Sequence, residues 1–325
     1  MLDIDTFLNE SPLPSIDCDG IKLGKILGEG GNAIVYRLEI NNEKYAAKVY
    51  TDDSIHEDFY DNLKYELDIA KKLSDSKYSV RTYKVGYIRG EFHNQILILM
   101  ELLTSHGDLY DYLQNVAKWT ACYKINNQFI PKPKNNYIYF NKDNNIHWCY
   151  ELSELQKIKI ARSIISGVKE LHSKGIIHGD IKTNNMVLHY LPKKQIVKLV
   201  DFGMSYFSEG NGLIDIYYKC GTMGYRAPEQ DQLKMNYSSD IYSTGVTIVE
   251  LWNGDIWNDE ETFNECRKEV LSGLRKIEAN NKMFGKLLRD SINMNHKKRI
   301  SAKTFLKRFN TIFNNDHKYK RYPQN

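Results

Sequence analysis

The chain has 325 residues, of which 42% are hydrophobic and 26% charged, a balance typical of globular proteins and unlike that of disordered or fibrous ones. The formal net charge is only +4 and the basic residues are scattered, which argues against nucleic acid or a membrane surface as the main partner. The five cysteines form no Cys-x-x-Cys pair, so we expect reduced thiols. Cys122, His147 and Cys149 are conceivable metal ligands, but we expect no structural metal there.

The first twenty residues form an N-terminal extension with its own composition. They contain five acidic residues and no Lys or Arg, so they lack the basic start of a secretory signal. The longest apolar run, Ile96 to Met100, is too short to cross a bilayer. We therefore expect an intracellular protein, in the cytosol or the nucleus.

Residues 21–101 follow, with a strand-like pattern interrupted by one helix. The segment from Asp58 to Leu73 carries apolar residues at helical spacing, which places Glu66 beside the inward face of a helix. Runs rich in β-forming residues and bounded by turn residues predict antiparallel strands at 21–27, 33–40, 45–50, 81–88 and 95–101. Residues 102–104 then connect this part to the rest of the chain.

Beyond residue 104 the pattern is mainly helical. The predicted helices span 109–114, 154–174, 239–252, 261–274, 282–291 and 302–309. A stretch rich in Asn, Lys and Tyr, about residues 115–150, interrupts them and contains Pro131 and Pro133. Its polarity and prolines predict an insertion or a long loop, either a site for a protein partner or a neutral insert.

Four motifs carry the chemistry. A glycine-rich turn with Gly28, Gly30 and Gly31 joins the first two predicted strands, where the absence of a Cβ lets backbone amides approach phosphate. Lys48 follows on the third strand. Downstream come, in order, the runs His178-Gly179-Asp180-Ile181-Lys182-Thr183-Asn184-Asn185, Asp201-Phe202-Gly203 and Ala227-Pro228-Glu229.

This order and spacing resembles the eukaryotic-type serine/threonine protein kinase family, in the variant whose catalytic loop reads His-Gly-Asp (the non-RD type). The resemblance covers residues 21–312 and implies an α+β, bilobal protein kinase-like fold. In that fold a small β-rich N-lobe with one regulatory helix (21–101) leads through a hinge (102–104) to a larger, mainly α-helical C-lobe (105–312). Residues 313–325 would form a C-terminal tail.

The resemblance also implies ATP and Mg²⁺ as cofactors and assigns their ligands. Lys48, paired with Glu66, would bind the α and β phosphates, while Asn185 and Asp201 would hold magnesium. Asp180 would orient the attacking hydroxyl and accept its proton, and Lys182 would stabilise the transferring phosphate. The nucleotide would be enclosed by Gly28, Gly30, Gly31, Val35, Ala46, Met100, Glu101, Leu103, Asp108 and Val187.

Gly179 replaces the arginine that precedes the catalytic aspartate in many protein kinases, where it pairs with a phosphate on the activation loop. That pairing cannot form here, so we hypothesise that activity does not depend on activation-loop phosphorylation. The candidate modification sites in that loop are Ser205, Ser208, Tyr217, Tyr218 and Thr222.

The acceptor class follows from the same resemblance. The run from Gly221 to Glu229 resembles the peptide-docking segment of protein kinases, and Lys182 with Thr222 matches the serine/threonine class, so serine and threonine hydroxyls of proteins are the expected acceptors. Glu229 is expected to pair with Arg299, and Asp240 to anchor the catalytic loop.

Two alternatives stay open at this point. One is a nucleotide-binding pseudokinase scaffold that binds partners through the insert. The other is a small-molecule phosphotransferase, since a His-Gly-Asp loop with an asparagine five residues after the aspartate also occurs in enzymes similar to aminoglycoside and choline kinases.

Overall fold

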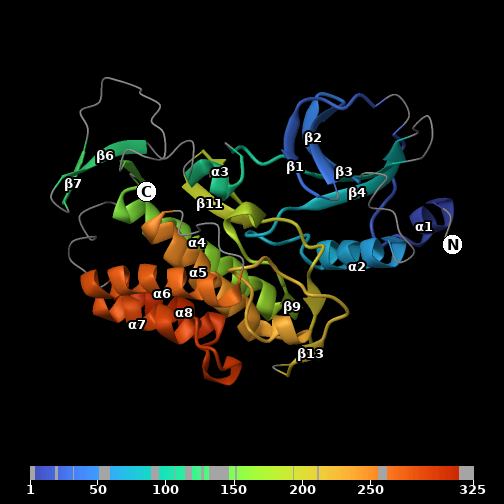
Figure 1. The fold of residues 1–325 in the computed structure, drawn as a ribbon. Coiled ribbons are helices and arrows are strands. Elements are labelled where there is room, and N and C mark those ends of the chain that lie inside the picture. The colour runs from blue at the N-terminus through green and yellow to red at the C-terminus, as the bar shows by residue number, and fades with distance from the viewer. Residues whose placement is uncertain are drawn as a thin grey trace.

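The computed structural model describes residues 4–18, 21–31, 33–50, 59–88, 95–105, 107–113, 119–125, 128–131, 146–150, 152–192, 194–210, 212–254 and 262–314. A β-rich lobe and a helical lobe lie side by side, as the sequence predicted, and the chain passes between them at residues 102–104 (Figure 1). Polar residues around this passage are the candidate active site.

The N-terminal lobe is built on a five-stranded antiparallel sheet. Its strands, in the spatial order β1-β2-β3-β5-β4, are β1 (Ile26–Glu29), β2 (Ala33–Ile40), β3 (Glu43–Tyr50), β5 (Gln95–Glu101) and β4 (Thr82–Ile88). The predicted helix is α2 (Phe59–Lys72) and packs on one face of the sheet (Figure 1). The bounds expected for the first strand, 21–27, are wrong: β1 begins at Ile26 and ends at Glu29, and before it Gly24 and Lys25 only exchange bonds with Arg37.

The N-terminal extension is not an irregular lead-in. Residues 4–10 form a helix, α1 (Ile4–Glu10), and the chain then bonds to the free edge of β4 through a parallel bridge between Ser15 and Val85. The sequence did not predict this helix, because seven residues are too few for a stable helix without tertiary contacts.

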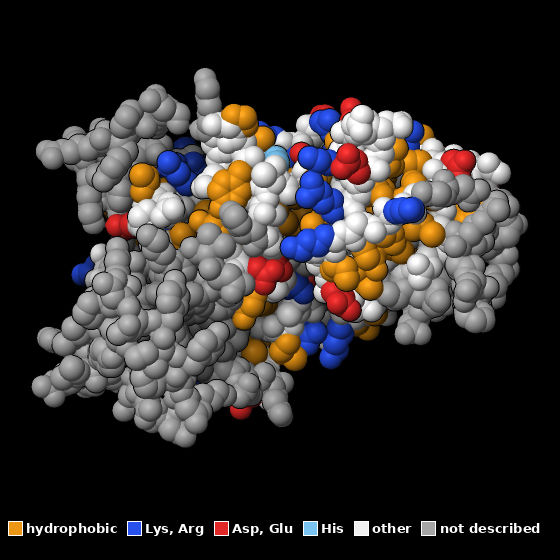
Figure 2. Space-filling model, turned by 90° about the horizontal axis from the view of Figure 1, so that it is seen from above, with side chains coloured by type: hydrophobic (Ala, Val, Ile, Leu, Met, Phe, Trp, Pro, Cys, Tyr) orange, Lys and Arg blue, Asp and Glu red, His pale blue; other side chains and the backbone are white. Residues whose placement is uncertain are grey.

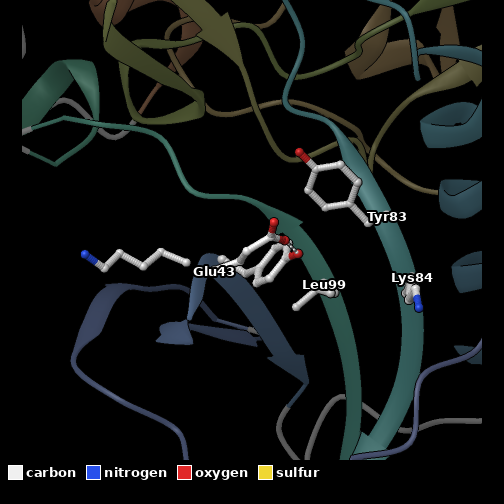
Figure 3. Close-up of a pocket in the computed structure, with 6 residues that line it drawn as sticks. Glu43, Tyr83, Lys84 and Leu99 are labelled. Carbon is white, nitrogen blue, oxygen red and sulfur yellow. Dashed lines mark hydrogen bonds between the residues drawn. The ribbon is translucent and has the colours of Figure 1, made fainter. Parts of the chain in front are cut away.

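The sheet face opposite α2 carries its own apolar cluster, formed by Cys18, Leu38, Ala47, Val49, Leu97 and Leu99. Seen from above, hydrophobic side chains lie over this lobe among charged ones (Figure 2). An open cavity of about 410 Å³ lies on the same face, lined by Glu43, Lys44, Tyr45, Tyr83, Lys84 and Leu99 (Figure 3). It contains none of the predicted site residues.

The C-terminal lobe is built on five long helices. They are α4 (Glu154–Ser173), α5 (Tyr237–Asn253), α6 (Phe263–Asn280), α7 (Lys282–Ser291) and α8 (Ala302–Asn314). Capping boxes begin α4, α5 and α6, where Ser153, Asn236 and Thr262 accept bonds from the first turn. α5 is buried from Ser239 to Leu251, so it forms the axis on which the other elements of the lobe pack.

Short elements complete the lobe beside the passage between lobes. The helix α3 (Leu109–Asp111) and the hairpin β10 (Met186–Leu191) and β11 (Lys194–Leu199) lie there. Two further antiparallel pairs join β9 (Ile176–Ile177) to β12 (Tyr206–Phe207) and β13 (Ile214–Asp215) to β14 (Lys234–Met235). Single 3-10 turns span Thr183–Asn185, Gln230–Gln232 and His296–Lys298.

The insert contains strands that its polar composition did not predict. β6 (Trp119–Ile125), β7 (Gln128–Pro131) and β8 (Ile146–Tyr150) form an antiparallel sheet in the order β7-β6-β8. Aromatic and β-branched residues within these runs favour strands. The side chains of Cys122, His147 and Cys149 lie outside the described set.

Across the described residues, no helix has the length and apolar character to span a bilayer.

Candidate active site

Lys48 and Glu66 join the sheet to the helix α2. The distance from Lys48 Nζ to Glu66 Oε1 is 2.9 Å, and the two side chains are only 14% and 15% exposed. Burial by itself lowers the pKa of Lys48, but the negative charge of Glu66 and the other groups nearby raise it well above its usual value. The ammonium group is therefore charged and held in one place, as phosphate binding requires.

Asp201 lies on the other side of Lys48. Its Oδ1 is 3.2 Å from Lys48 Nζ, and its side chain is half exposed. The Lys48 charge holds the pKa of this carboxyl below its usual value, so Asp201 is ionised at neutral pH. The backbone φ of +61° is uncommon for a residue with a Cβ, and such conformations cluster at functional sites.

The carboxylate of Asp180 is held by donors at both oxygens. Oδ1 accepts bonds from the Thr222 backbone N–H (2.8 Å) and Oγ1 (2.9 Å). Oδ2 accepts one from Asn185 Nδ2 (2.8 Å) and lies 3.0 Å from Lys182 Nζ. Lys182 also donates to Thr222 Oγ1 at 2.6 Å. The four residues thus form one connected group around a carboxylate with a single orientation.

Asn185 and Asp201 form a donor set that fits a magnesium ion. Asn185 donates through Nδ2 to the side chain and the backbone oxygen of Asp180, which leaves its amide oxygen as a ligand. Asp201 supplies an ionised and partly exposed carboxylate. Amide and carboxylate oxygens are hard ligands of the kind that Mg²⁺ prefers. Asn185 and Asp201 would hold the ion.

A buried aspartate on α5 anchors the catalytic loop, as the sequence predicted. Asp240 is 1% exposed and accepts bonds from the backbone N–H groups of His178 (2.9 Å) and Gly179 (3.0 Å). His172 lies 2.9 Å from the same carboxylate. Because α5 is the axis of the lobe, the position of Asp180 is tied to the most buried part of the protein.

The glycine-rich turn leaves its backbone open toward solvent. Gly30 N–H donates to Ala33 O at 2.9 Å, which closes the turn between β1 and β2. A Cβ placed on Gly28 or Gly31 would meet no atom within 4 Å. Open space therefore adjoins the turn at Gly28 and Gly31.

The residues expected around adenine lie on elements of both lobes. Val35 lies opposite Lys48 in the sheet, and Ala46 lies opposite Met100. Met100 packs against the apolar cores of both lobes. The other residues of this set occupy the end of β5 (Glu101), the connection after it (Leu103) and β10 (Val187).

Asp108 is partly exposed and forms hydrogen bonds within its own chain. Its Oδ1 accepts a bond from Asp111 N–H at 2.7 Å, which caps α3, and its Oδ2 accepts one from Asn184 at 3.3 Å. Burial raises the pKa of this carboxyl. The predicted contact of Asp108 with ribose stays a prediction.

Comparison with known proteins agrees with this geometry. The family model described as protein kinase domain matches residues 21–309. The chain belongs to the protein kinase family.

Several relatives of this chain are named as kinases. It is 27% identical over 293 residues to the maternal embryonic leucine zipper kinase of Xenopus tropicalis, covering 88% of this chain and 38% of the relative. It is 27% identical over 263 residues to a serine/threonine-protein kinase of Caenorhabditis elegans, covering 78% and 26%. A protein of Encephalitozoon cuniculi named as a probable serine/threonine-protein kinase is 37% identical over 130 residues, covering 39% and 23%. The kinase spans less than two fifths of the length of each.

The segment from Gly221 to Glu229 ends in a buried ion pair that the family resemblance predicted. Arg299 donates to both carboxylate oxygens of Glu229, at 2.7 and 2.8 Å, and the two side chains are 0% and 7% exposed. Burial raises the pKa of Glu229, but the hydrogen bonds and charge of Arg299 outweigh it, so the net pKa is lowered. The segment therefore has a defined position before any substrate arrives.

Sequence reasoning missed several residues that position the kinase site. Tyr50 donates to Glu66 Oε2 at 2.8 Å. The buried Lys198 donates to Glu101 at 2.6 Å, and Thr104 N–H donates to His189 at 3.0 Å, so both tie the hinge to the C-lobe hairpin. Tyr50 follows Lys48 on the inward face of β3, and this alternation could have identified it. No sequence signal marks Lys198 or His189.

Gly179 is required by the backbone of the catalytic loop. Its φ is +81°, and a Cβ there would lie 2.2 Å from Met204 O. We expect Gly179→Ala to lower the free energy of unfolding by at least ~1–2 kcal/mol, the cost of the left-handed conformation alone. Denaturant unfolding measures this, with Gly210→Ala, where a Cβ meets nothing within 4 Å, as the matched control. Equal stability of the two variants would contradict the prediction.

Proposed function

We propose that this kinase transfers the γ-phosphate of ATP to serine or threonine hydroxyls of proteins. The observation that carries the proposal is the group formed by Asp180, Lys182 and Thr222. Thr222 belongs to the peptide-docking segment, so the segment that would receive a protein substrate is bonded directly to the carboxylate that would accept its proton. Because the reaction uses ATP, the proposal places the protein inside the cell.

The roles of the side chains follow from phosphoryl-transfer chemistry. Little covalent work is needed, so catalysis consists of orienting the hydroxyl and neutralising phosphate oxygens. Asp180 orients the hydroxyl and accepts its proton, while Lys182 faces the transferring phosphate. Lys48 holds the phosphates that remain on the nucleotide. Magnesium, when bound, neutralises phosphate charge.

We further propose that the active arrangement needs no phosphate on the activation loop. The start of this loop is held by hydrogen bonds that involve no phosphate group. Phe207 N–H donates to the hydroxyl of Tyr65 on α2 at 2.7 Å. Ser208 N–H donates to Gly175 O at 2.8 Å, and the Tyr237 hydroxyl donates to Ser208 O at 2.6 Å. These bonds support the loop where Gly179 offers no arginine.

The candidate modification sites differ in their exposure to solvent. Ser205 and Ser208 are buried and Thr222 bonds Asp180, whereas Tyr217 is 94% and Tyr218 44% exposed. We expect protein treated with phosphatase, and checked by mass spectrometry, to keep the kcat of untreated protein. A Tyr217→Phe, Tyr218→Phe double variant should also keep it. Loss of activity on dephosphorylation, restored by rephosphorylation, would contradict the proposal.

The function itself is tested by transfer of labelled γ-phosphate from Mg-ATP to generic basic and acidic proteins, followed by phosphoamino-acid analysis. Asp201→Ala is the control for contaminating kinases. Label on serine or threonine that disappears in the control supports the proposal. Nucleotide binding without transfer would favour the scaffold alternative, and label on a metabolite alone would favour a small-molecule phosphotransferase.

A further inference from the structure

The N-terminal segment, residues 4–16, inserts one aromatic side chain into the N-lobe core. Phe7, on α1, is 0% exposed. It belongs to an apolar cluster with Phe59, Leu63 and Leu67 of α2 and with Val85 of β4. Figure 1 shows α1 beside α2. The segment therefore packs against the helix that carries Glu66.

The segment is also attached at two further points. Glu10, at the end of α1, forms an ion pair with Lys64 of α2 at 2.9 Å. Further on, Ile16 N–H donates to Val85 O at 2.8 Å, and Val85 N–H donates to Pro14 O at 3.1 Å. The ion pair is exposed and contributes little, whereas the strand bonds fix the segment to the edge of the sheet. The segment thus bridges α2 and β4.

A continuous series of aromatic contacts leads from Phe7 toward the catalytic ion pair. The ring centroids of Phe7 and Tyr60 are 5.2 Å apart, those of Tyr60 and Phe59 5.4 Å, and those of Phe59 and Tyr50 5.2 Å. These separations are typical of favourable aromatic pairs.

The series ends at the carboxylate of Glu66. The Tyr50 hydroxyl donates to Glu66 Oε2 at 2.8 Å, and Glu66 Oε1 holds Lys48 at 2.9 Å. Tyr50 is 6% exposed, and burial raises the pKa of its hydroxyl, so it acts as a donor at neutral pH. Each of the two Glu66 oxygens therefore accepts a hydrogen bond, and the bond from Tyr50 fixes the orientation of the carboxylate toward Lys48.

We propose that the N-terminal segment is a positioning element of the active site: Phe7 packs α2 against the sheet, and Tyr50 then directs Glu66 onto Lys48. The inference rests on the proposed kinase function. In this proposal both residues act through Glu66 and not on the substrates. The rate of phosphoryl transfer falls steeply when the groups that hold the phosphate leave their positions. A shift of this ion pair should therefore slow the reaction.

The test uses two substitutions in the full-length chain. Phe7→Ala removes the buried ring, and we expect kcat to fall by between ~10- and ~100-fold. Tyr50→Phe removes only the hydroxyl, and we expect kcat to fall roughly 10-fold. Phe7→Leu, which restores an apolar side chain, should recover most of the activity lost in Phe7→Ala.

Matched controls separate positioning from loss of stability. Phe313→Ala empties an equally buried aromatic site in the C-lobe, and should lower the melting temperature without lowering kcat at temperatures where the protein is folded. Tyr45→Phe removes a hydroxyl from the same strand as Tyr50, where it bonds Glu43 at 2.5 Å on the opposite face. Its kcat should equal that of the unmodified protein.

Two further readouts decide the outcome. In a Glu66→Gln background, Phe7→Ala should cause no further loss of kcat, because both changes act through one ion pair. Hydrogen exchange should show faster exchange of the α2 amides in Phe7→Ala but not in Phe313→Ala. Additive losses of kcat, or α2 exchange that Phe7→Ala does not alter, would overturn the proposal. If the unmodified protein transfers no phosphate, the proposed function fails, and the exchange measurement still tests the segment.

Discussion

Asp180→Asn is expected to lower kcat by roughly 10²- to 10⁴-fold, the range that a positioned general base contributes. The amide that replaces the carboxylate cannot accept the proton of the acceptor hydroxyl. The substitution also replaces one of the two oxygens by an NH2 group, which is a donor. In one orientation this group would face the N–H of Thr222, and in the other it would face Asn185 and Lys182. All three of these residues are themselves donors to Asp180. The effect should therefore appear in the chemical step.

The measurement is steady-state transfer to a serine-containing protein, with ATP varied. The KM for ATP should change little, because Lys48 and the glycine-rich turn are untouched, and a Mg-ATP-induced rise in melting temperature should persist. Asn184→Ala is the matched control: it lies in the same loop and is exposed, but bonds Asp108 rather than Asp180. Full activity in Asp180→Asn would exclude this residue as the base.

Glu229→Gln is expected to lower the free energy of unfolding by about 3–5 kcal/mol, the usual cost of breaking a buried ion pair by removing one partner. Arg299 would keep its charge with no carboxylate, and its side chain is 0% exposed. Ser239 also donates to Glu229 at 2.7 Å, so the substitution affects the start of α5 as well. Denaturant unfolding at neutral pH measures the loss.

Asp290→Asn is the control for this pair. It removes one partner of the Arg308–Asp290 ion pair, whose side chains are 36% and 34% exposed, and should cost only about 0–1 kcal/mol. Similar losses in both variants would mean that burial does not strengthen the Glu229 pair.

The pH dependence of stability should differ between Glu229→Gln and the unmodified protein. The pKa of Glu229 is lowered in the folded protein, so its stabilisation is fully present above the unfolded value, about 4.3. It is lost as pH falls through the folded pKa. Glu229→Gln should therefore lose less stability than the unmodified protein when pH falls below about 4.3.

The chemical groups of the site could be predicted from the sequence because their order along the chain is distinctive. Asp180 and Asn185 lie in one short loop, so their contact depends on few backbone angles. The long helices of the C-lobe were also predicted, since an apolar stripe at helical spacing is a local property. Glu229 and Arg299 were paired only through the family resemblance.

The supporting contacts depend on segments that are distant in the sequence. Lys198 reaches Glu101 across 97 positions, and Tyr50 reaches Glu66 across the sheet and α2. Nothing in the local pattern around Lys198 distinguishes it from an ordinary strand residue, and the alternation that places Tyr50 on the inward face of β3 does not identify its partner. The strands of the insert were missed for a related reason, because its polar linkers obscured the β-forming runs between them.

The sequence by itself determined the family, the two lobes and the candidate catalytic groups, because these follow from local motifs and periodicities. Only the tertiary structure decided what holds those groups in place. Phe7 lies in a helix too short to be stable alone, and its burial arises from the cluster that α2 and the sheet form together. Burial and hydrogen-bond partners are properties of the packed chain, and so the support of the site becomes visible only when the chain is folded.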